Sequence, residues 1–186
     1  MHPQLQAVAD EFEHAYIRLR SLSRALPEEF WTRRADHGRW SIAECVGHLN
    51  LTSTAFLPLL RKGIAAARLL DGAPPVRYRR DLIGWLLWKT AGPPVRLRVK
   101  TAAAYIPNGS EEPGKLVEEF ERLGRTQVAC VREADGLPLG RIRITSPFNA
   151  RVKYNLFACL TILPRHQHRH LWQAEQTWRA LRKSTR

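Results

Sequence analysis

The chain has 186 residues, 44% of them hydrophobic, which favours one folded domain over residues 1–186 and argues against general disorder. Thirty Lys and Arg against 17 Asp and Glu give a net charge of +13, which predicts salt-dependent attraction to nucleic acid and anionic membranes. No zinc-finger, recognition-helix or Gly-rich phosphate-loop pattern accompanies the charge, so we expect no specific nucleic-acid partner.

The first two expected helices have clear sequence signals. Apolar residues at helical spacing predict an amphipathic helix over residues 3–25, which Pro27 ends. Ser41 followed by Glu44 is a capping-box pattern, and it predicts a second helix that runs to about Gly63 or a turn beyond. His48 lies one turn after Glu44, so that carboxylate either closes the cap, which we favour, or orients the imidazole.

The middle of the chain is less regular. Residues 71–80 are typical of a linker, and residues 82–88 are short and very apolar between flanking cations. That segment is either buried over the bundle, which we favour because large exposed apolar patches are rare, or an interfacial membrane helix. Residues 95–100 and 141–145 alternate apolar and basic residues. We expect extended loops there, because pairing them as strands would place cations opposite cations.

Two further helices complete the expected fold. One covers residues 111–134, and the last begins near Ala150, ends near Arg182 and bends at Pro164. Four amphipathic helices with few strand signals predict an all-α four-helix bundle with a long irregular connection between helices 2 and 3.

The last helix carries the most informative spacing. His166 and His170 are four residues apart, so both imidazoles lie on one helical face and are able to chelate one divalent ion. The third ligand must come from elsewhere, and His48 is the best candidate. The alternative is a solvated basic turn. His168 points away from the other two, whereas Gln173 shares their face and either hydrogen-bonds to a ligand or caps another helix.

Two segments together resemble a known family. Trp-Ser-Ile-Ala-Glu-Cys-x-x-His-Leu from Trp40 and the later His-x-x-Arg-His-Leu-Trp-Gln from His166 are similar to the DinB-like superfamily. The resemblance is strong over residues 40–60 and 155–176 and thin over 71–113. It implies a four-helix bundle that holds one metal ion with three histidines, one on the second helix and two on the last. Carried over by position, these are His48, His166 and His170.

The resemblance and the chemistry together suggest a class of reaction, and they leave open whether the protein is an enzyme. Members of the family include thiol-dependent transferases and isomerases. A three-histidine zinc or nickel ion keeps an open position, and it would activate a low-molecular-weight thiol or a water against a small electrophilic substrate. The expected function is therefore a metal-dependent thiol (S-)transferase or hydrolase. The alternative is a non-catalytic, stress-associated, metal-binding bundle.

Composition also bears on the location of the chain. Cys45, Cys130 and Cys159 form no CxxC pair, and their odd number fits a reducing compartment. The N-terminus lacks a signal-peptide layout, and no apolar run reaches the ~20 residues of a membrane span. We therefore expect a cytoplasmic protein without a membrane span. A homodimer is left open.

Overall fold

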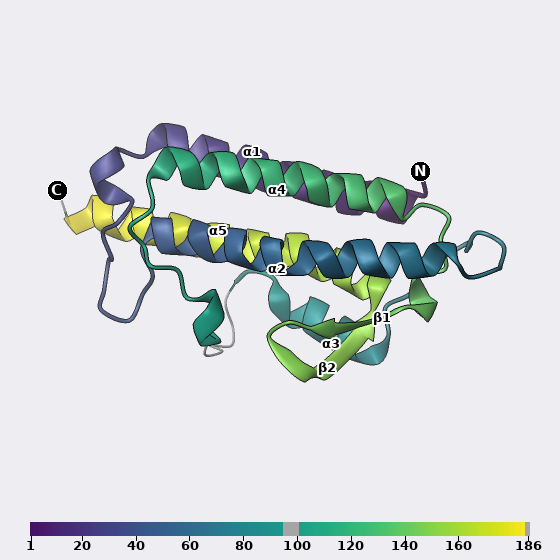
Figure 1. Ribbon diagram of the computed structural model, residues 1–186. Helices are drawn as coiled ribbons and strands as arrows, with labels where there is room; N and C mark the ends of the chain where they lie inside the picture. Colours follow the sequence, from purple (N-terminus) through teal and green to yellow (C-terminus); the bar gives the residue numbers. More distant parts are fainter. Residues whose placement is uncertain (95–100, 185–186) are drawn as a thin grey trace.

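The computed structural model describes residues 1–94 and 101–184, so the prediction for residues 95–100 lies outside the described part of the chain. Four long helices form the body of the molecule, and a short helix and a β-hairpin lie beneath it (Figure 1). The helices are α1 (Pro3–Ala25), α2 (Ile42–Arg68), α3 (Leu82–Ala91), α4 (Pro113–Glu133) and α5 (Leu156–Ser184), and the strands are β1 (Arg143–Ser146) and β2 (Asn149–Asn155).

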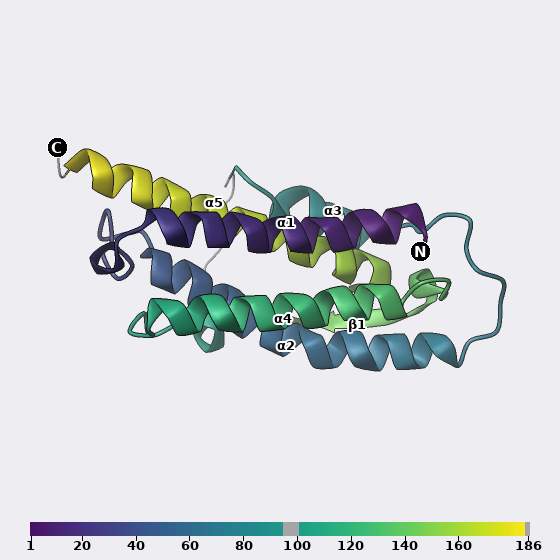
Figure 2. The same cartoon turned by 90° about the horizontal axis from the view of Figure 1, so that it is seen from above.

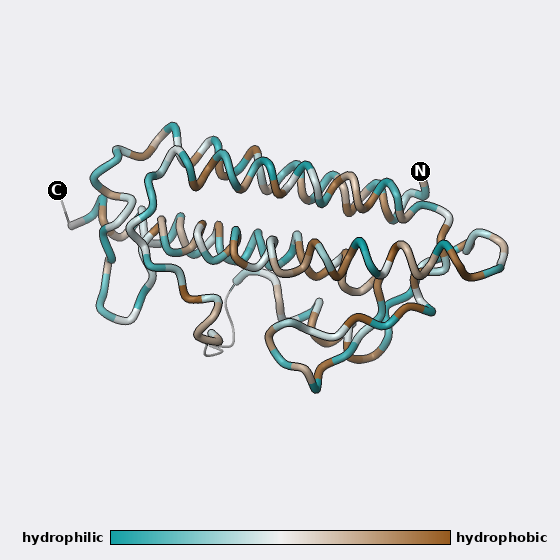
Figure 3. Tube along the Cα trace, viewed as in Figure 1, coloured by the Kyte–Doolittle hydropathy of each residue, from teal (hydrophilic) through white to brown (hydrophobic). Residues whose placement is uncertain are grey.

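The long helices form two layers. Helices α1 and α4 lie above α2 and α5, and the view from above shows all four nearly aligned (Figures 1 and 2). Helix α2 contacts α4 and α5, and α1 contacts the same two helices. Hydrophobic and hydrophilic residues are interspersed along each of the four, as in amphipathic helices (Figure 3). The predicted helical bundle is confirmed.

Local signals explain where the first two helices begin. Helix α1 has the predicted bounds, and the His2 ring accepts a hydrogen bond from the backbone N–H of Gln4. The capping box of α2 is complete. Ser41 Oγ accepts from the backbone N–H of Glu44 at 3.1 Å, and the Glu44 carboxylate accepts from the backbone N–H of Ser41 at 2.7 Å. The capping box therefore fixes where α2 begins.

The hydrophobic core consists of two clusters separated along the bundle. One contains Leu60, Leu123 and Leu160, and the other contains Leu49 and Leu171. Most of the buried polar side chains of α2 and α5 lie between these clusters in the sequence: Asn50, Thr52, Ser53, Gln167 and His170, with His48 beside them. A polar layer therefore crosses the middle of the core.

The segment before α5 differs from the prediction. Residues 149–155 form β2 and not the start of the last helix, and they pair antiparallel with β1. The expectation of an extended loop over residues 141–145 was wrong because the partner strand is not the basic segment 95–100. In the observed register Arg143 faces Asn155 and Lys153 faces Thr145, so neither cation lies opposite another cation.

The connection between α2 and α4 is also more regular than predicted, because it contains α3. Only one residue of that helix, Gly84, is fully buried, so the prediction that residues 82–88 are buried was wrong. Within the described residues, no helix has both the length and the apolar character required to cross a bilayer.

Candidate metal centre

Three imidazoles converge in the polar layer from two helices. His48 comes from the second turn of α2, and His166 and His170 come from consecutive turns of α5. The Nε2 atom of His166 lies 3.4 Å from Nε2 of His48 and 3.1 Å from Nε2 of His170. The prediction that His48 joins the i, i+4 pair therefore agrees with the geometry.

The spacing of these nitrogens suits one small ion. Ligand nitrogens at a tetrahedral zinc site lie about 2.0–2.1 Å from the metal, which places them about 3.3 Å from each other. The two measured Nε2 separations bracket that value. All three candidate ligand atoms lie within 4.8 Å of one another, and no fourth His, Cys, Asp or Glu joins the group within the described residues. The donor set therefore fits a divalent ion with a vacant coordination position.

His48 is oriented by a backbone group. Its Nδ1 lies 2.8 Å from the carbonyl oxygen of Tyr105, in the short helical turn Ala103–Tyr105. With Nδ1–H donating to that carbonyl, Nε2 presents its lone pair to the other histidines. Tyr105 carried no signal in the sequence, because nothing local predicts which loop carbonyl reaches a helix far away along the chain.

Glu44 was the other candidate for orienting His48. Its carboxylate instead accepts the capping hydrogen bond from Ser41 and two hydrogen bonds from the guanidinium of Arg34. Burial alone would raise the pKa of Glu44, but the hydrogen bonds from Arg34 and Ser41 outweigh burial and hold this pKa below its ordinary value. Of the two roles considered for Glu44, the structure shows the capping role, and the Tyr105 carbonyl takes the place expected of a carboxylate.

Gln173 lies next to His170, as its spacing predicted. Its Oε1 atom is buried without a hydrogen bond of normal geometry, and so is Nδ1 of His170. The Gln173 side chain nevertheless acts to raise the pKa of His170, as an acceptor near the ring does. A small rotation of Gln173 would satisfy both buried atoms and leave Nε2 of His170 free to bind a metal.

Burial keeps the three imidazoles neutral. It is the largest cause that lowers the pKa of His48, and it lowers the pKa of His166 to about 3 with help from His48 and Arg169. The pKa of His170 is also well below its ordinary value, first because of burial and then because of the neighbouring imidazoles and Arg169. Neutral imidazole is the form that binds metals, so the cluster is ready to bind an ion at neutral pH.

Aromatic rings surround the cluster. Trp40 packs against the rings of His48 and His170, with centroids 5.0 and 5.9 Å away. Phe148, in the turn of the hairpin, lies 4.6 Å from the ring of Tyr105 and 6.3 Å from that of His166. Phe148 carried no signal in the sequence, because the hairpin that brings it to the site was not predicted. Cavities of about 290 and 550 Å³ lie elsewhere and contain none of the three histidines.

His168 is oriented away from the cluster, as predicted. Its Nε2 lies 3.1 Å from a carboxylate oxygen of Glu11, and its Nδ1 lies 3.3 Å from the guanidinium of Arg18, so it faces α1. Arg18 also forms an ion pair with Glu175. His168 therefore links α5 to α1 and is a natural control for experiments on the other histidines.

Comparison with known families agrees with this geometry. Residues 11–174 match the DinB superfamily. The chain belongs to the DinB superfamily. The match includes all three converging histidines and both segments that carried the resemblance. Neither the comparison with curated proteins nor the comparison with solved structures gave a match. Family membership and the three-histidine cluster are together compatible with metal binding.

Proposed function

We propose that this member of the DinB superfamily is a metal-dependent enzyme that transfers a thiol to a small electrophile or hydrolyses it. The observation that carries the proposal is the convergence of three Nε2 atoms with no fourth protein ligand in the described part of the chain. Three protein ligands and a vacancy are typical of catalytic sites, whereas structural sites are closed by four. Zinc and nickel are the proposed ions, because imidazole suits both.

A divalent ion at this site would lower the pKa of a thiol or a water and so supply a nucleophile at neutral pH. The chain contributes the remaining functions. Tyr105 holds His48 in the orientation that directs Nε2 inward, and a rotation of Gln173 would do the same for His170. Trp40 shields His48 and His170 from water, which strengthens electrostatic interactions there, whereas His166 beside Phe148 stays half-buried.

The thiol would have to come from solution. Cys45, Cys130 and Cys159 are all buried and unpaired. Burial raises the pKa of the Cys45 and Cys159 thiols far above neutral pH, and it is the largest cause that raises the pKa of Cys130. None of them is therefore an exposed thiolate, and a low-molecular-weight thiol is the natural nucleophile for the transferase reaction.

The alternative is a metal-binding bundle without turnover, associated with stress. One observation favours it: Trp40 lies against two of the three imidazoles and would leave less room beside them for a substrate. The variant Trp40→Ala separates the two functions. If the site is catalytic, opening this side changes the apparent affinity for the substrate, and if the site only binds metal, no reaction appears in either protein.

The experiment is a conjugation assay on zinc-loaded and nickel-loaded protein. A panel of low-molecular-weight thiols is offered with a chloronitrobenzene, and ester hydrolysis is followed without thiol. We expect metal-dependent turnover that His48→Ala abolishes and His168→Ala preserves. The absence of metal-dependent and His48-dependent turnover with every thiol, and of hydrolysis, would reject the enzyme in favour of the non-catalytic bundle.

A further inference from the structure

Helix α3 exposes apolar side chains that a water-facing helix does not normally present. The exposed fractions of Leu82 and Leu86 are 79% and 55%, and those of Ile83 and Trp85 are 44% and 45%. We call these four residues the docking face. The opposite side of the helix, with Gly84, is packed against the bundle. A helix that is apolar on all sides is stable only when both sides are covered.

The helix is fixed with this face outward. A Cβ at Gly84 would lie 2.2 Å from Cβ of Ala158, so α3 lies directly against α5. The Asp81 carboxylate caps its first turn at 2.9 Å from the backbone N–H of Gly84 and forms an ion pair with Arg143 of the hairpin. These contacts hold α3 against both α5 and the hairpin, so rotation cannot bury the docking face.

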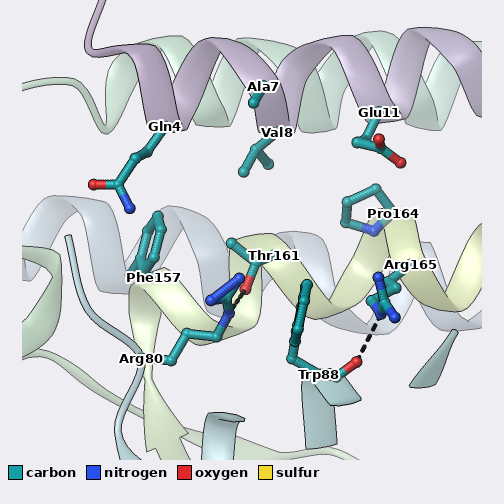
Figure 4. A pocket seen from close by; sticks show the side chains of 10 residues that line it. All are labelled: Gln4, Ala7, Val8, Glu11, Arg80, Trp88, Phe157, Thr161, Pro164 and Arg165. Atoms are coloured by element: carbon teal, nitrogen blue, oxygen red, sulfur yellow. Dashed lines mark hydrogen bonds between the residues drawn. The ribbon is translucent and has the colours of Figure 1, made fainter. Parts of the chain in front are cut away.

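The other end of α3 is held by two arginines. The guanidinium carbons of Arg80 and Arg165 each lie 4.1 Å from the ring centroid of Trp88. Figure 4 shows Trp88 between them at the edge of the cavity, with the guanidinium of Arg165 donating a hydrogen bond to the carbonyl oxygen of Trp88 at 2.8 Å. Trp88 is therefore part of the packing, whereas Trp85 is 45% exposed, and the ammonium of Lys89 lies 5.1 Å from its ring centroid on the same surface.

Positive charge is concentrated in the same part of the molecule. Residues 72–94 contain four Lys and Arg and one Asp, and residues 137–165 contain five Lys and Arg and no acidic residue, so these two segments carry +8 of the net +13. Four of these cations lie on or next to α3 and β2, are exposed and make no ion pair within the described residues. We call them the basic rim: Arg79, Lys89, Arg151 and Lys153.

The opposite side of the molecule does not share this positive charge. Residues 111–136, which include α4, contain four Lys and Arg and seven Asp and Glu. Helices α1 and α4 lie on the far side of the bundle from α3 and the hairpin (Figure 1). Helix α1 has three Asp and Glu and three Arg, so only α4 makes the upper side acidic. The molecule is therefore polarised, with a basic and apolar underside and a neutral to acidic upper side, and an anionic surface would bind it in one orientation.

We propose that the docking face and the basic rim bind the surface of a membrane that contains anionic phospholipids. Apolar side chains with a Trp would enter the boundary between headgroups and acyl chains, and the rim would contact the phosphates. A second copy of the chain would bring the same positive charge against itself. A nucleic acid would match the rim and leave four apolar side chains in water. The anionic membrane satisfies both features.

The test is co-sedimentation with vesicles of phosphatidylcholine alone or mixed equally with phosphatidylglycerol. We expect binding to the mixed vesicles only, and weaker binding at higher salt. The double variant Leu82→Gln and Leu86→Gln keeps good helix formers and should weaken the partition coefficient at least about tenfold. Ile17→Gln, at an equally exposed apolar residue of α1, is the matched control and should bind unchanged.

The contribution of the basic rim to vesicle binding is tested by the same co-sedimentation experiment. Lys89→Gln with Lys153→Gln should weaken binding several-fold, whereas Arg24→Gln on α1 should not. His48→Ala should bind as the parent does, because the inference does not depend on the metal site. Absent or equal binding to both vesicles, or binding unchanged by the Leu→Gln pair, would overturn the proposal. A dimer in sedimentation that the Leu82→Gln and Leu86→Gln pair dissociates would also overturn the proposal. RNA binding that this pair leaves intact, by a protein that does not bind vesicles, would overturn it as well.

Discussion

The histidine cluster and helix α3 are opposite departures from ordinary packing. At the cluster, titratable groups are buried or half-buried: His48 and His170 expose 3% and 8% of their surface, and His166 is half-buried. On α3, large apolar groups are exposed instead. Buried polar groups and exposed apolar patches are the two kinds of position that packing alone does not explain. Both regions involve α5, which carries His166 and His170 and contacts α3 through Ala158 and Arg165, so a single helix supports two features that suggest function.

The two regions are also held differently. Helix α3 is fixed by close packing at Gly84 and by the ion pair between Asp81 and Arg143, so its geometry is complete without a ligand. The imidazoles contact one another through nitrogen atoms whose lone pairs converge, and a buried Nδ1 and a buried amide oxygen stay unsatisfied beside them. A cation would stabilise the cluster, whereas α3 lacks only a surface to cover it.

The largest expected effect is therefore stabilisation by metal. Zinc added to stripped protein at about a thousand times its Kd should raise the free energy of unfolding by about 4 kcal/mol. Thermal unfolding at several zinc concentrations measures it. The shift should disappear in His170→Ala and persist in His168→Ala. If the metal-free protein were unfolded at neutral pH, the ion would be structural, and the contrast between the cluster and α3 would be weakened.

Acid should destabilise the stripped protein through the same cluster. The three histidines have lowered pKa values in the folded state, about 3 for His166, against about 6.5 when unfolded. Below pH 6.5 the unfolded chain binds more protons than the folded chain. The contribution of the neutral histidines to the free energy of unfolding is therefore complete above that pH and is lost as the pH falls toward their pKa in the folded state. Each histidine should contribute a slope of up to about 1.4 kcal/mol per pH unit. Urea unfolding of His170→Ala between neutral pH and pH 5 should show a shallower slope.

A glycine pair tests the packing of α3. Gly84→Ala places a methyl group 2.2 Å from Ala158 and should destabilise the protein by about 1–3 kcal/mol. Gly124→Ala, in α4 with no atom within 4 Å of the new methyl group, should stabilise it by about 0.5–1 kcal/mol. Urea unfolding measures both. If the two substitutions changed the free energy of unfolding equally, α3 would not pack against α5 as described.

The smallest expected effect concerns the start of α2. Ser41→Ala removes one hydrogen bond of the capping box and should cost about 1 kcal/mol. Metal stoichiometry should not change, because the Tyr105 carbonyl still orients His48. A loss of metal in this variant would mean that the cap, and not the loop, determines the direction of the imidazole.

Local patterns predicted the parts of the structure that local chemistry decides. The Ser41–Glu44 box, the bounds of α1 and the shared face of His166 and His170 all follow from hydrogen bonds or periods within a few residues. The hairpin was missed because residues 149–155 pair with a strand that the sequence pattern assigned to a loop. The exposure of α3 was missed because periodicity reports how apolar a helix is and not which side meets a neighbour.

The measurement that tests the central claim most directly is the metal content of protein purified without an affinity tag. The parent and His168→Ala should each contain about one divalent ion per chain, and His48→Ala, His166→Ala and His170→Ala should contain almost none, with the same helical circular dichroism. Full metal content in His48→Ala together with His170→Ala, or no metal in the parent after incubation with zinc and with nickel, would contradict the assignment of the site.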